Sequence, residues 1–528
     1  MPTPDVTVIT PVHDTRDYLG PWFSSLLGQT MPRDRFEVIA LNDGSTDGSA
    51  RVLDELACTH PELLKVVHLP PTGGPARPRN VGLRLANGRY VFFLDSDDRL
   101  GPEALERLTA YADRLGSDVV LGKMAGINGR RVPRDVFRHN QKQADVISSG
   151  ILYALTPAKL FRREFIERNR IRFRSDLLIG SDHPFVMESY LRARRISVLA
   201  DCTCYYLVAR DGGGNISLGP AVTASLRLPY MRASAETALR IAGPGKILDA
   251  LLRRVLRIEF TDLLGPGFTA LPPPEQCAAL AALRAYLDDW YRAELSPSLP
   301  SWVRWRIHCV QQGKRAELCA LIGTEQADGL GFRADGSGGG APVLVSEGHA
   351  YARLPGFRDP AFGIPDSCYD ITAELAVEHR LSGVALDRDG LTVAGTTALP
   401  RLAEAPSAVE VLARERGSGA VLRLPTVHHD GAFRARWAAS ELSRAGTWDL
   451  FAEVCCAGVR REVRIGSSRD PGLTLPSPCY WTTPYGNLSL LVPEPRERQT
   501  PAAEQDLAPE PGLGRGGGRG ALVQRDDR

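Results

Sequence analysis

The stretch Arg89-Tyr-Val-Phe-Phe-Leu-Asp95-Ser-Asp97-Asp98 decides the fold of the N-terminal part of the chain. The apolar run from Tyr90 to Leu94 is typical of a strand that is buried on both faces. Three carboxylates follow it, at the point where a strand meets solvent. In open α/β sheets this carboxyl edge is where ligands bind. Asp-x-Asp at such an edge suits a hard divalent cation that keeps open positions for phosphate oxygens, and the alternative is a loop of solvated acids.

Residues 1 to about 125 alternate between predicted strands and predicted helices. Pro11 is expected to end the first strand, and Pro102 with Glu103 is expected to open the last helix. Repeated β–α units predict an α/β fold with a parallel, doubly wound sheet. The expected strands are Val6–Ile9, Phe36–Leu41, Leu64–His68 and Tyr90–Leu94, and the expected helices before the last are Tyr18–Leu27, Ser49–Ala57 and Arg79–Ala86.

Three polar loops follow strand ends on the same edge of this sheet. They read Pro11-Val-His13-Asp14, Asn42-Asp43-Gly-Ser45 and Asp95-Ser-Asp97-Asp98. With Pro78-Arg79-Asn80-Val-Gly between the last two, they resemble, in the same order, the motifs of the family 2 glycosyltransferases, whose fold is GT-A. The resemblance covers residues 6 to about 100 and continues more weakly to about residue 217.

The resemblance implies an enzyme that takes a sugar from a nucleotide donor, with UDP as the expected nucleotide. Asp43 is expected to accept a hydrogen bond from the uracil imide, against the alternative of an acid that caps the next turn. Asp97 is expected to ligate Mn²⁺ or Mg²⁺, which would neutralise the leaving diphosphate. The other positions expected to bind the nucleotide-sugar are Pro11, His13, Arg77, Arg79, Asp95 and Ser96.

Two arginines follow the Gly73-Gly74-Pro75 loop at the start of a predicted helix. Guanidinium groups and free helix N–H groups bind diphosphate well, so either Arg77 or Arg79 is expected to hold it and the other to be a surface charge. The chain departs from the family pattern at His13, where Tyr is usual, and at Asn42, where Asp is more common. These two differences leave the contacts to the base open.

A proton acceptor is expected downstream, in the segment Phe173–Phe185. This segment resembles the Glu-Asp-x-x-Phe motif of the family, with Ser181 in place of Glu. The resemblance implies that Asp182 is the catalytic base, which takes the proton of an acceptor hydroxyl in a single, inverting displacement. A helix-capping aspartate and His183 as the base are the alternatives. Because proline prefers the first helical position, the sequence predicts His183 as the cap before Pro184.

Composition limits the classes of function. A chain of 528 residues predicts about two to four domains. The net charge of +2 argues against a dedicated nucleic-acid binder. No apolar segment approaches the ~20 residues that cross a bilayer, and no signal peptide is recognisable. The expectation is a cytoplasmic protein, either free or peripheral at the inner face of the membrane, whose ten scattered cysteines are reduced thiols.

The segment from residue 123 to 195 is basic, with sixteen Lys and Arg against seven Asp and Glu. It is either a solvated face or a surface that attracts an anionic acceptor or an acidic membrane. Family 2 enzymes that decorate wall teichoic acid act on a phosphate-rich polymer, and their Gly-Gly-Pro-x-x-Pro-Arg-Asn loop is similar to Gly73–Asn80. The resemblance therefore implies a cell-surface polymer as acceptor. The alternatives are a capsular, lipid-linked or small-molecule acceptor, and a glycan-binding scaffold whose transferase domain has decayed.

The second half of the chain predicts further domains. The catalytic domain is expected at 1–220 and a helical linker region at 221–333. The apolar stripes of this region are expected in the core, and its residues Arg253, Arg254 and Arg257 are expected in solvent. Residues 342–494 predict an immunoglobulin-like β-sandwich that assembles homo-oligomers, and residues 495–528 a disordered tail. The expected strands are Tyr369–Val377, Val409–Leu412, Ala420–Leu424, Phe433–Trp437 and Trp448–Cys455.

Overall fold

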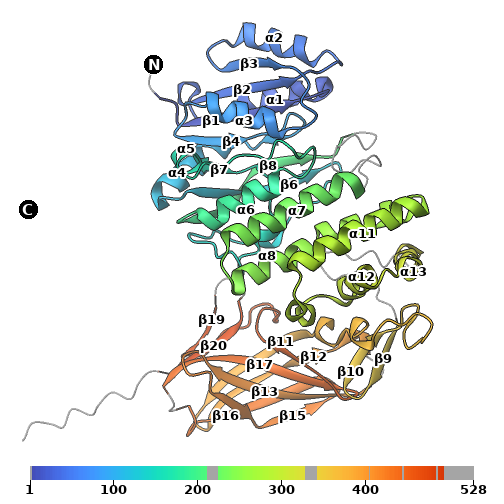
Figure 1. Cartoon of the computed structure of the whole chain (residues 1–528). Helices are drawn as coiled ribbons and strands as arrows, with labels where there is room; N and C mark the ends of the chain where they lie inside the picture. The colour runs from blue at the N-terminus through green and yellow to red at the C-terminus, as the bar shows by residue number, and fades with distance from the viewer. Residues whose placement is uncertain are drawn as a thin grey trace, which may run out of the picture.

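A computed structural model describes residues 3–210, 224–327, 342–402, 405–442, 445–482 and 486–492. In Figure 1 the chain passes from an α/β part, in blue and teal, through a group of helices to a β-rich part in orange. Residues 211–223, residues 328–341 and the expected tail 495–528 lie outside the described residues.

The N-terminal part is built on one eight-stranded sheet in the order β3-β2-β1-β4-β7-β6-β8-β5. The strands β3, β2, β1 and β4 are parallel, as the β–α pattern predicts. However, β7 is antiparallel to β4 and β6, and β5 is antiparallel to β8, so the sheet is mixed. The strands are β1 (Val6–Val12), β2 (Phe36–Asp43), β3 (Leu64–Leu69), β4 (Tyr90–Phe93), β5 (Arg99–Leu100), β6 (Val119–Ile127), β7 (Leu160–Arg162) and β8 (Ile196–Val208).

The bounds of the helices in this part agree with the expected ones to within a few residues. The connection from β6 to β7, all of which is described, consists of short 3₁₀ turns and contains no crossover helix. A strand entered without a crossover helix need not be parallel to its neighbours. The helices are α1 (Arg16–Leu27), α2 (Ser49–Thr59), α3 (Ala76–Leu85), α4 (Ala104–Leu115), α5 (Arg163–Arg168) and α6 (Asp182–Arg192), with 3₁₀ turns η1 (Arg33–Arg35), η2 (Asp135–Phe137) and η3 (Ile151–Tyr153).

Two local predictions in this part are wrong. Pro11 does not end β1, which continues to Val12 and pairs there with β2. β4 pairs with β1 only as far as Ile9, so the missing N–H of Pro11 can face a side without a strand neighbour. His183 is not the cap of α6, because the helix begins at Asp182. Pro184 is therefore the third helical residue, where the backbone N–H has no partner within the helix in any case.

The helical region packs directly on the N-terminal part, with one continuous apolar core. The predicted stripe is buried, since Leu251, Leu252 and Val255 are fully inaccessible. Arg254, in contrast to the prediction, is buried as well. The helices are α7 (Ala224–Ile241), α8 (Lys246–Arg257), α9 (Glu259–Leu263), α10 (Pro266–Thr269), α11 (Pro273–Trp290), α12 (Ser301–Gln312) and α13 (Arg315–Ala327), with η5 (Ala293–Ser298).

The C-terminal part contains the expected β-sandwich, made of two antiparallel sheets whose inner faces share one apolar cluster. Trp437 of one sheet meets Trp448 of the other edge to face, with ring centroids 5.3 Å apart. One sheet holds β11 (Glu378–Asp387), β12 (Gly390–Ala398), β15 (Thr426–His429) and β16 (Ala432–Ala438). The other holds β13 (Ser407–Glu415), β14 (Val421–Leu424), β17 (Gly446–Cys456), β18 (Val459–Arg464), β19 (Cys479–Trp481) and β20 (Leu488–Val492).

The segment that joins the helices to the sandwich differs from the prediction. Residues 369–377 form no strand, because Asp370 turns the chain by accepting a hydrogen bond from the Thr372 N–H at 2.8 Å. Tyr369 and Ile371 instead join the core of the helical region. The joining elements are the hairpin β9 (Val343–Ser346) and β10 (His349–Ala352), with η6 (Asp366–Cys368), η7 (Thr372–Glu374) and, after β12, η8 (Pro400–Leu402).

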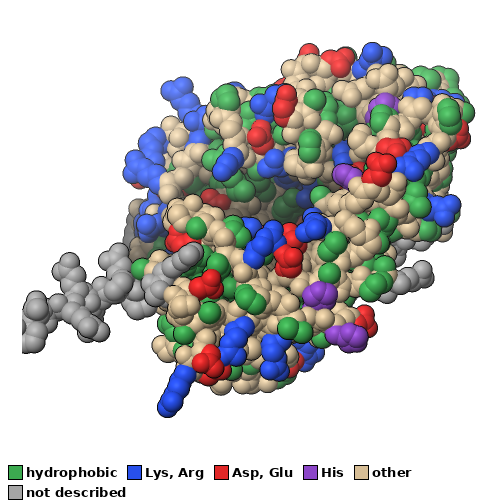
Figure 2. All heavy atoms as spheres, turned by 90° about the horizontal axis from the view of Figure 1, so that it is seen from below, with side chains coloured by type: hydrophobic (Ala, Val, Ile, Leu, Met, Phe, Trp, Pro, Cys, Tyr) green, Lys and Arg blue, Asp and Glu red, His purple; other side chains and the backbone are tan. Residues whose placement is uncertain are grey.

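The structure bears on three expectations from the sequence, which concern the charge of the surface, membrane-spanning segments and the cysteines. The face shown in Figure 2 mixes Lys and Arg with Asp and Glu around a hollow, so it presents no field of a single sign. No helix in the described ranges is both long and apolar enough to span a bilayer. All ten cysteines are free in the structure.

Candidate active site

The structure brings the three polar strand-end loops together at one edge of the sheet. The hydroxyl of Thr15, after β1, donates to Ser96 Oγ at 2.9 Å, which joins the first loop to the Asp-x-Asp loop. The Nδ1 atom of His13 lies 2.9 Å from the carbonyl oxygen of Asp43, which joins the first loop to the second. Residues more than eighty positions apart in the sequence therefore line one site.

Asp43 anchors the loop that precedes α3. Its side chain is 4% exposed and accepts hydrogen bonds from the backbone N–H of Thr72 at 3.0 Å and from the Thr72 hydroxyl at 2.9 Å. A carboxylate offers about four lone-pair sites, so both oxygens keep capacity for a further donor such as a ring N–H. His13 is 48% exposed and presents its imidazole to solvent, while Pro11 is half-buried in β1.

Of the two arginines at the start of α3, only Arg79 lies inside the site. It is 5% exposed, and its Nη2 donates to Asp95 Oδ1 at 2.7 Å. Its guanidinium lies 5.3 Å from the centroid of the Phe173 ring. Arg77 is exposed. Burial opposes the charge of Arg79, but the carboxylates of Asp95 and Asp182 raise its pKa, so the group stays a cation.

Three carboxylates crowd the loop after β4. Burial, together with the charges of Asp97 and Asp95, raises the pKa of Asp98 to about 8. Asp98 accepts hydrogen bonds from the Tyr205 hydroxyl at 2.6 Å and from the Val208 N–H at 2.7 Å. Burial and Asp95 also raise the pKa of Asp97, against the opposing charge of Arg210. Ionisation of all three carboxylates would thus place more negative charge in the loop than its buried surroundings favour.

This charge fits a divalent cation. The Nε of Arg210 lies 2.6 Å from Asp97 Oδ2 and provides one positive charge. Across the described ranges no three His, Cys, Asp or Glu side chains are arranged to hold a metal ion by themselves. A small hard cation such as Mg²⁺, however, is usually held by one or two carboxylates together with substrate phosphates. The oxygen donors of Asp97 and its raised pKa fit a cation of that kind.

Asp182 lies close enough to Arg79 for its charge to act on the guanidinium. It is half-buried at the start of α6, and its charge acts on the buried side chains of Arg79 and Lys159. Lys159 is 1% exposed, its ammonium donates to the carbonyl oxygen of Thr156, and burial lowers its pKa to about 7 against the opposing effect of Asp182. The ring of His183 turns away to Glu259, with Nδ1 2.8 Å from Oε1.

Four residues that the sequence did not indicate take part in this arrangement. Tyr205 bridges the acidic loop, since its hydroxyl also accepts the Asp95 N–H at 3.2 Å. Arg210 stands directly before a Gly-rich stretch at the end of β8, which is the signal that could have pointed to it. Lys159 and Glu259 gave no signal, because only the packing shows that they are buried.

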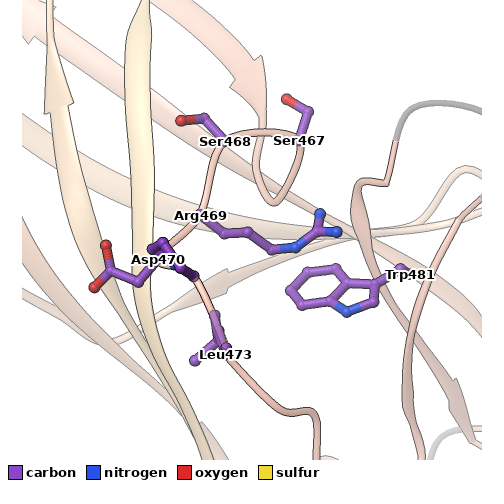
Figure 3. Close-up of a pocket in the computed structure, with 8 residues that line it drawn as sticks. Ser467, Ser468, Arg469, Asp470, Leu473 and Trp481 are labelled. Atoms are coloured by element: carbon purple, nitrogen blue, oxygen red, sulfur yellow. The ribbon is translucent and has the colours of Figure 1, made fainter. Parts of the chain in front are cut away.

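A separate cavity of about 640 Å³ lies in the sandwich. It is lined by residues 467–473 and Trp481, and the Arg469 guanidinium lies 4.2 Å from the Trp481 ring centroid. Figure 3 shows the Asp470 carboxylate pointing away from this stacked pair. The cavity therefore lacks the paired carboxylates that the strand-end site contains.

The class of protein follows from the fold and this site. Residues 7–170 match the family described as "Glycosyl transferase family 2", and residues 228–322 match "Glycosyl transferase TarS linker domain". Residues 7–170 thus form a family 2 glycosyltransferase domain with a GT-A-like sheet, as the motifs predicted, and residues 228–322 form a TarS-type linker domain.

The chain is similar to two characterised relatives. A poly(ribitol-phosphate) beta-glucosyltransferase of Bacillus spizizenii is 27% identical over 475 residues, which cover 88% of this chain and 72% of the relative. The poly(ribitol-phosphate) beta-N-acetylglucosaminyltransferase TarS of Staphylococcus aureus is 38% identical over 207 residues, which cover 39% of this chain and 36% of TarS.

Structures of TarS extend the likeness to the other parts of the chain. The crystal structure of S. aureus TarS aligns with a TM-score of 0.58 at 25% identity, over 92% of this chain and 85% of that chain. A structure of TarS 1–349 in complex with UDP-GlcNAc aligns with a TM-score of 0.56 at 29% identity, over 67% of this chain and 97% of that chain. The catalytic sheet, the helices and the sandwich therefore all have counterparts in one solved protein.

Proposed function

We propose that the protein is an inverting, metal-dependent transferase that moves a sugar from a UDP donor to a hydroxyl of a poly(ribitol-phosphate)-like wall polymer. The observation that supports this most is the position of Arg79. Its guanidinium forms an ion pair with Asp95 of the acidic loop and interacts electrostatically with the carboxylate of Asp182. A donor sugar held at the acidic loop would thus lie within reach of a carboxylate that can accept a proton.

The donor half of the reaction belongs to the strand-end loops. Asp43 accepts the uracil imide N–H with its free lone pairs, and the exposed ring of His13 stacks on the base. Arg79 holds the diphosphate, since it is the buried member of the arginine pair, while Asp95 and Ser96 line the ribose and sugar side. When bound at Asp97, Mn²⁺ or Mg²⁺ supplies positive charge to the leaving diphosphate.

The acceptor half belongs to Asp182. Its carboxylate takes the proton of the acceptor hydroxyl while that oxygen attacks the anomeric carbon and the bond to the diphosphate breaks. One displacement of this kind inverts the anomeric configuration. The charge of Asp182 acts on the buried guanidinium of Arg79, so the carboxylate lies near the group that would hold the diphosphate.

The acceptor assignment is supported by the names of the relatives. Both characterised relatives carry poly(ribitol-phosphate) in their names, and one TarS structure holds UDP-GlcNAc. We assign residues 1–220 to catalysis, 221–333 to the helical linker and 342–494 to a sandwich that assembles homo-oligomers. The enzyme would work at the cytoplasmic face of the membrane, where the basic segment 123–195 meets an anionic acceptor.

A donor and acceptor screen tests the function. UDP release is measured with several UDP-sugars, with and without poly(ribitol-phosphate), and with Mn²⁺ or a chelator. We expect turnover that needs both the polymer and the metal. Release that is equally fast with a lipid-linked or capsular acceptor would contradict the polymer assignment, and glycan binding without any release would favour a scaffold with a decayed site.

Asp97→Asn and Asp182→Asn separate the two halves of the reaction. Asp97→Asn is expected to abolish turnover and to weaken metal-dependent UDP binding. Asp182→Asn is expected to keep donor binding in calorimetry but to lower transfer by roughly two to four orders of magnitude. Unchanged transfer in the second variant would mean that another group accepts the proton.

A further inference from the structure

Side chains of the helical region pack against the turn that carries Asp182. Gly180 has φ +67°, and a Cβ atom there would meet the Tyr230 ring of α7 at 2.6 Å. Tyr230 also packs with Leu177 in a small apolar cluster. The ring of His183 then meets the edge of Tyr230, with centroids 5.7 Å apart. The turn is thus fitted against a helix that lies outside the catalytic sheet.

A buried charge network fixes the same turn from a second side. Glu259, at the start of α9, is 0% exposed, and its Oε1 accepts a hydrogen bond from His183 Nδ1 at 2.8 Å. Arg254 of α8 donates to the same oxygen, and its Nε donates to the Leu152 carbonyl oxygen at 2.7 Å. Arg254 and His183 keep the pKa of Glu259 below its usual value although burial opposes this.

Burial of this charge network is unfavourable for the stability of the fold. Removing a carboxylate and its partners from water costs several kcal/mol per ion, and buried ion pairs are often no more stabilising than apolar packing. In addition, Glu259 Oε2 is buried and finds no partner among the described residues. The geometric effect is definite, however. With Nδ1 held by a carboxylate, the ring of His183 has one orientation, and the first turn of α6 is held with it.

We infer that Glu259 is a positioning residue, which acts through His183 to hold the catalytic turn and so places the Asp182 carboxylate against the acceptor hydroxyl. The inference rests on the proposed role of Asp182. It gives the linker domain a part in the reaction, because Tyr230, Arg254 and Glu259 all come from helices outside the catalytic sheet.

Glu259→Gln in the full-length protein tests this, with Glu325→Gln as the matched control. Glu325 is also a buried carboxylate of the helical region, paired with Arg306 at 2.9 Å between α12 and α13, but it does not contact the turn. Both variants lose a buried charge pair and should lose comparable thermal stability. Only Glu259→Gln is expected to lower kcat, by roughly ten- to a hundred-fold, as loss of an orienting partner does elsewhere, with the Kd for UDP unchanged.

A double-mutant cycle and hydrogen exchange complete the test. His183→Gln should lower kcat to a similar extent, and the double variant His183→Gln with Glu259→Gln should be no worse than either single change. Amides of the turn at 180–185 should exchange faster in Glu259→Gln than in Glu325→Gln. Equal kcat loss in the two glutamate variants, additive effects in the cycle or unchanged exchange in the turn would each overturn the inference. Full activity of Asp182→Asn would instead reject the proposed base, while the exchange result would still decide whether Glu259 holds the turn.

Discussion

Lys159→Met is the sharpest test of the electrostatics around Asp182. Lys159 is almost completely buried next to the ring of Tyr190, with its Nζ 6.0 Å from the ring centroid. Its surroundings therefore favour the neutral amine, and burial lowers the pKa from the ordinary value of 10.5 to about 7. Methionine has a similar length and no charge, so the substitution removes the titration with little change of packing.

The size of the effect follows from proton linkage. Between pH 10.5 and about 7 the unfolded chain binds a proton at this lysine that the folded chain does not. The stability that the neutral amine contributes is thus present above pH 10.5 and is lost as the pH falls toward 7. Each pH unit in this window changes the free energy of unfolding by about 1.4 kcal/mol, which amounts to about 5 kcal/mol over the whole window.

Urea unfolding at pH 7, 8 and 9 measures this effect. The stability of Lys159→Met relative to the natural protein is expected to rise by about 1.4 kcal/mol for each pH unit by which the pH is lowered. Lys65→Met, at an exposed position of β3, is the control and should show a constant difference. A difference for Lys159→Met that is also constant from pH 7 to 9 would refute the reasoning, because the ammonium would then be charged throughout.

Three further outcomes are expected. Arg79→Ala should weaken UDP binding in calorimetry far more than Arg77→Ala, since only the first lies in the site, and equal effects would contradict the assignment. Trp437→Ala should destabilise the sandwich by about 3–5 kcal/mol in thermal unfolding, whereas Val427→Ala, at a side chain 78% exposed, should change little. A chain cut after residue 377 should still hydrolyse the donor but lose oligomer mass in light scattering, and a full-length monomer would reject the assembly role.

The sequence predicted those parts of the site that depend on the order of strands. Parallel β–α units bring the carboxyl ends of β1, β2 and β4 to one edge, so Asp43 and Asp97 could be placed without coordinates. The antiparallel insertion of β7 could not be predicted, since three residues carry too little periodicity. Lys159 directly precedes β7, and its burial follows from that insertion. The strand predicted at 369–377 is absent for a different reason. There the turn at Asp370 outweighs the alternation of apolar residues.

The cations of the site differ from its acids in how they can be recognised. The acids stand in strand-end motifs whose spacing is fixed by the sheet, but a buried arginine or lysine is identified only by what covers it. Arg254 illustrates this. Its apolar neighbours on α8 predicted a core stripe, and its own charge predicted exposure to solvent. The fold instead buries it against Glu259, five residues later. A buried cation therefore requires a carboxylate that the same fold supplies. Among the described residues Asp95 pairs with Arg79, Glu259 with Arg254 and Glu325 with Arg306, so the positions of these buried arginines mark which acids the fold holds in place.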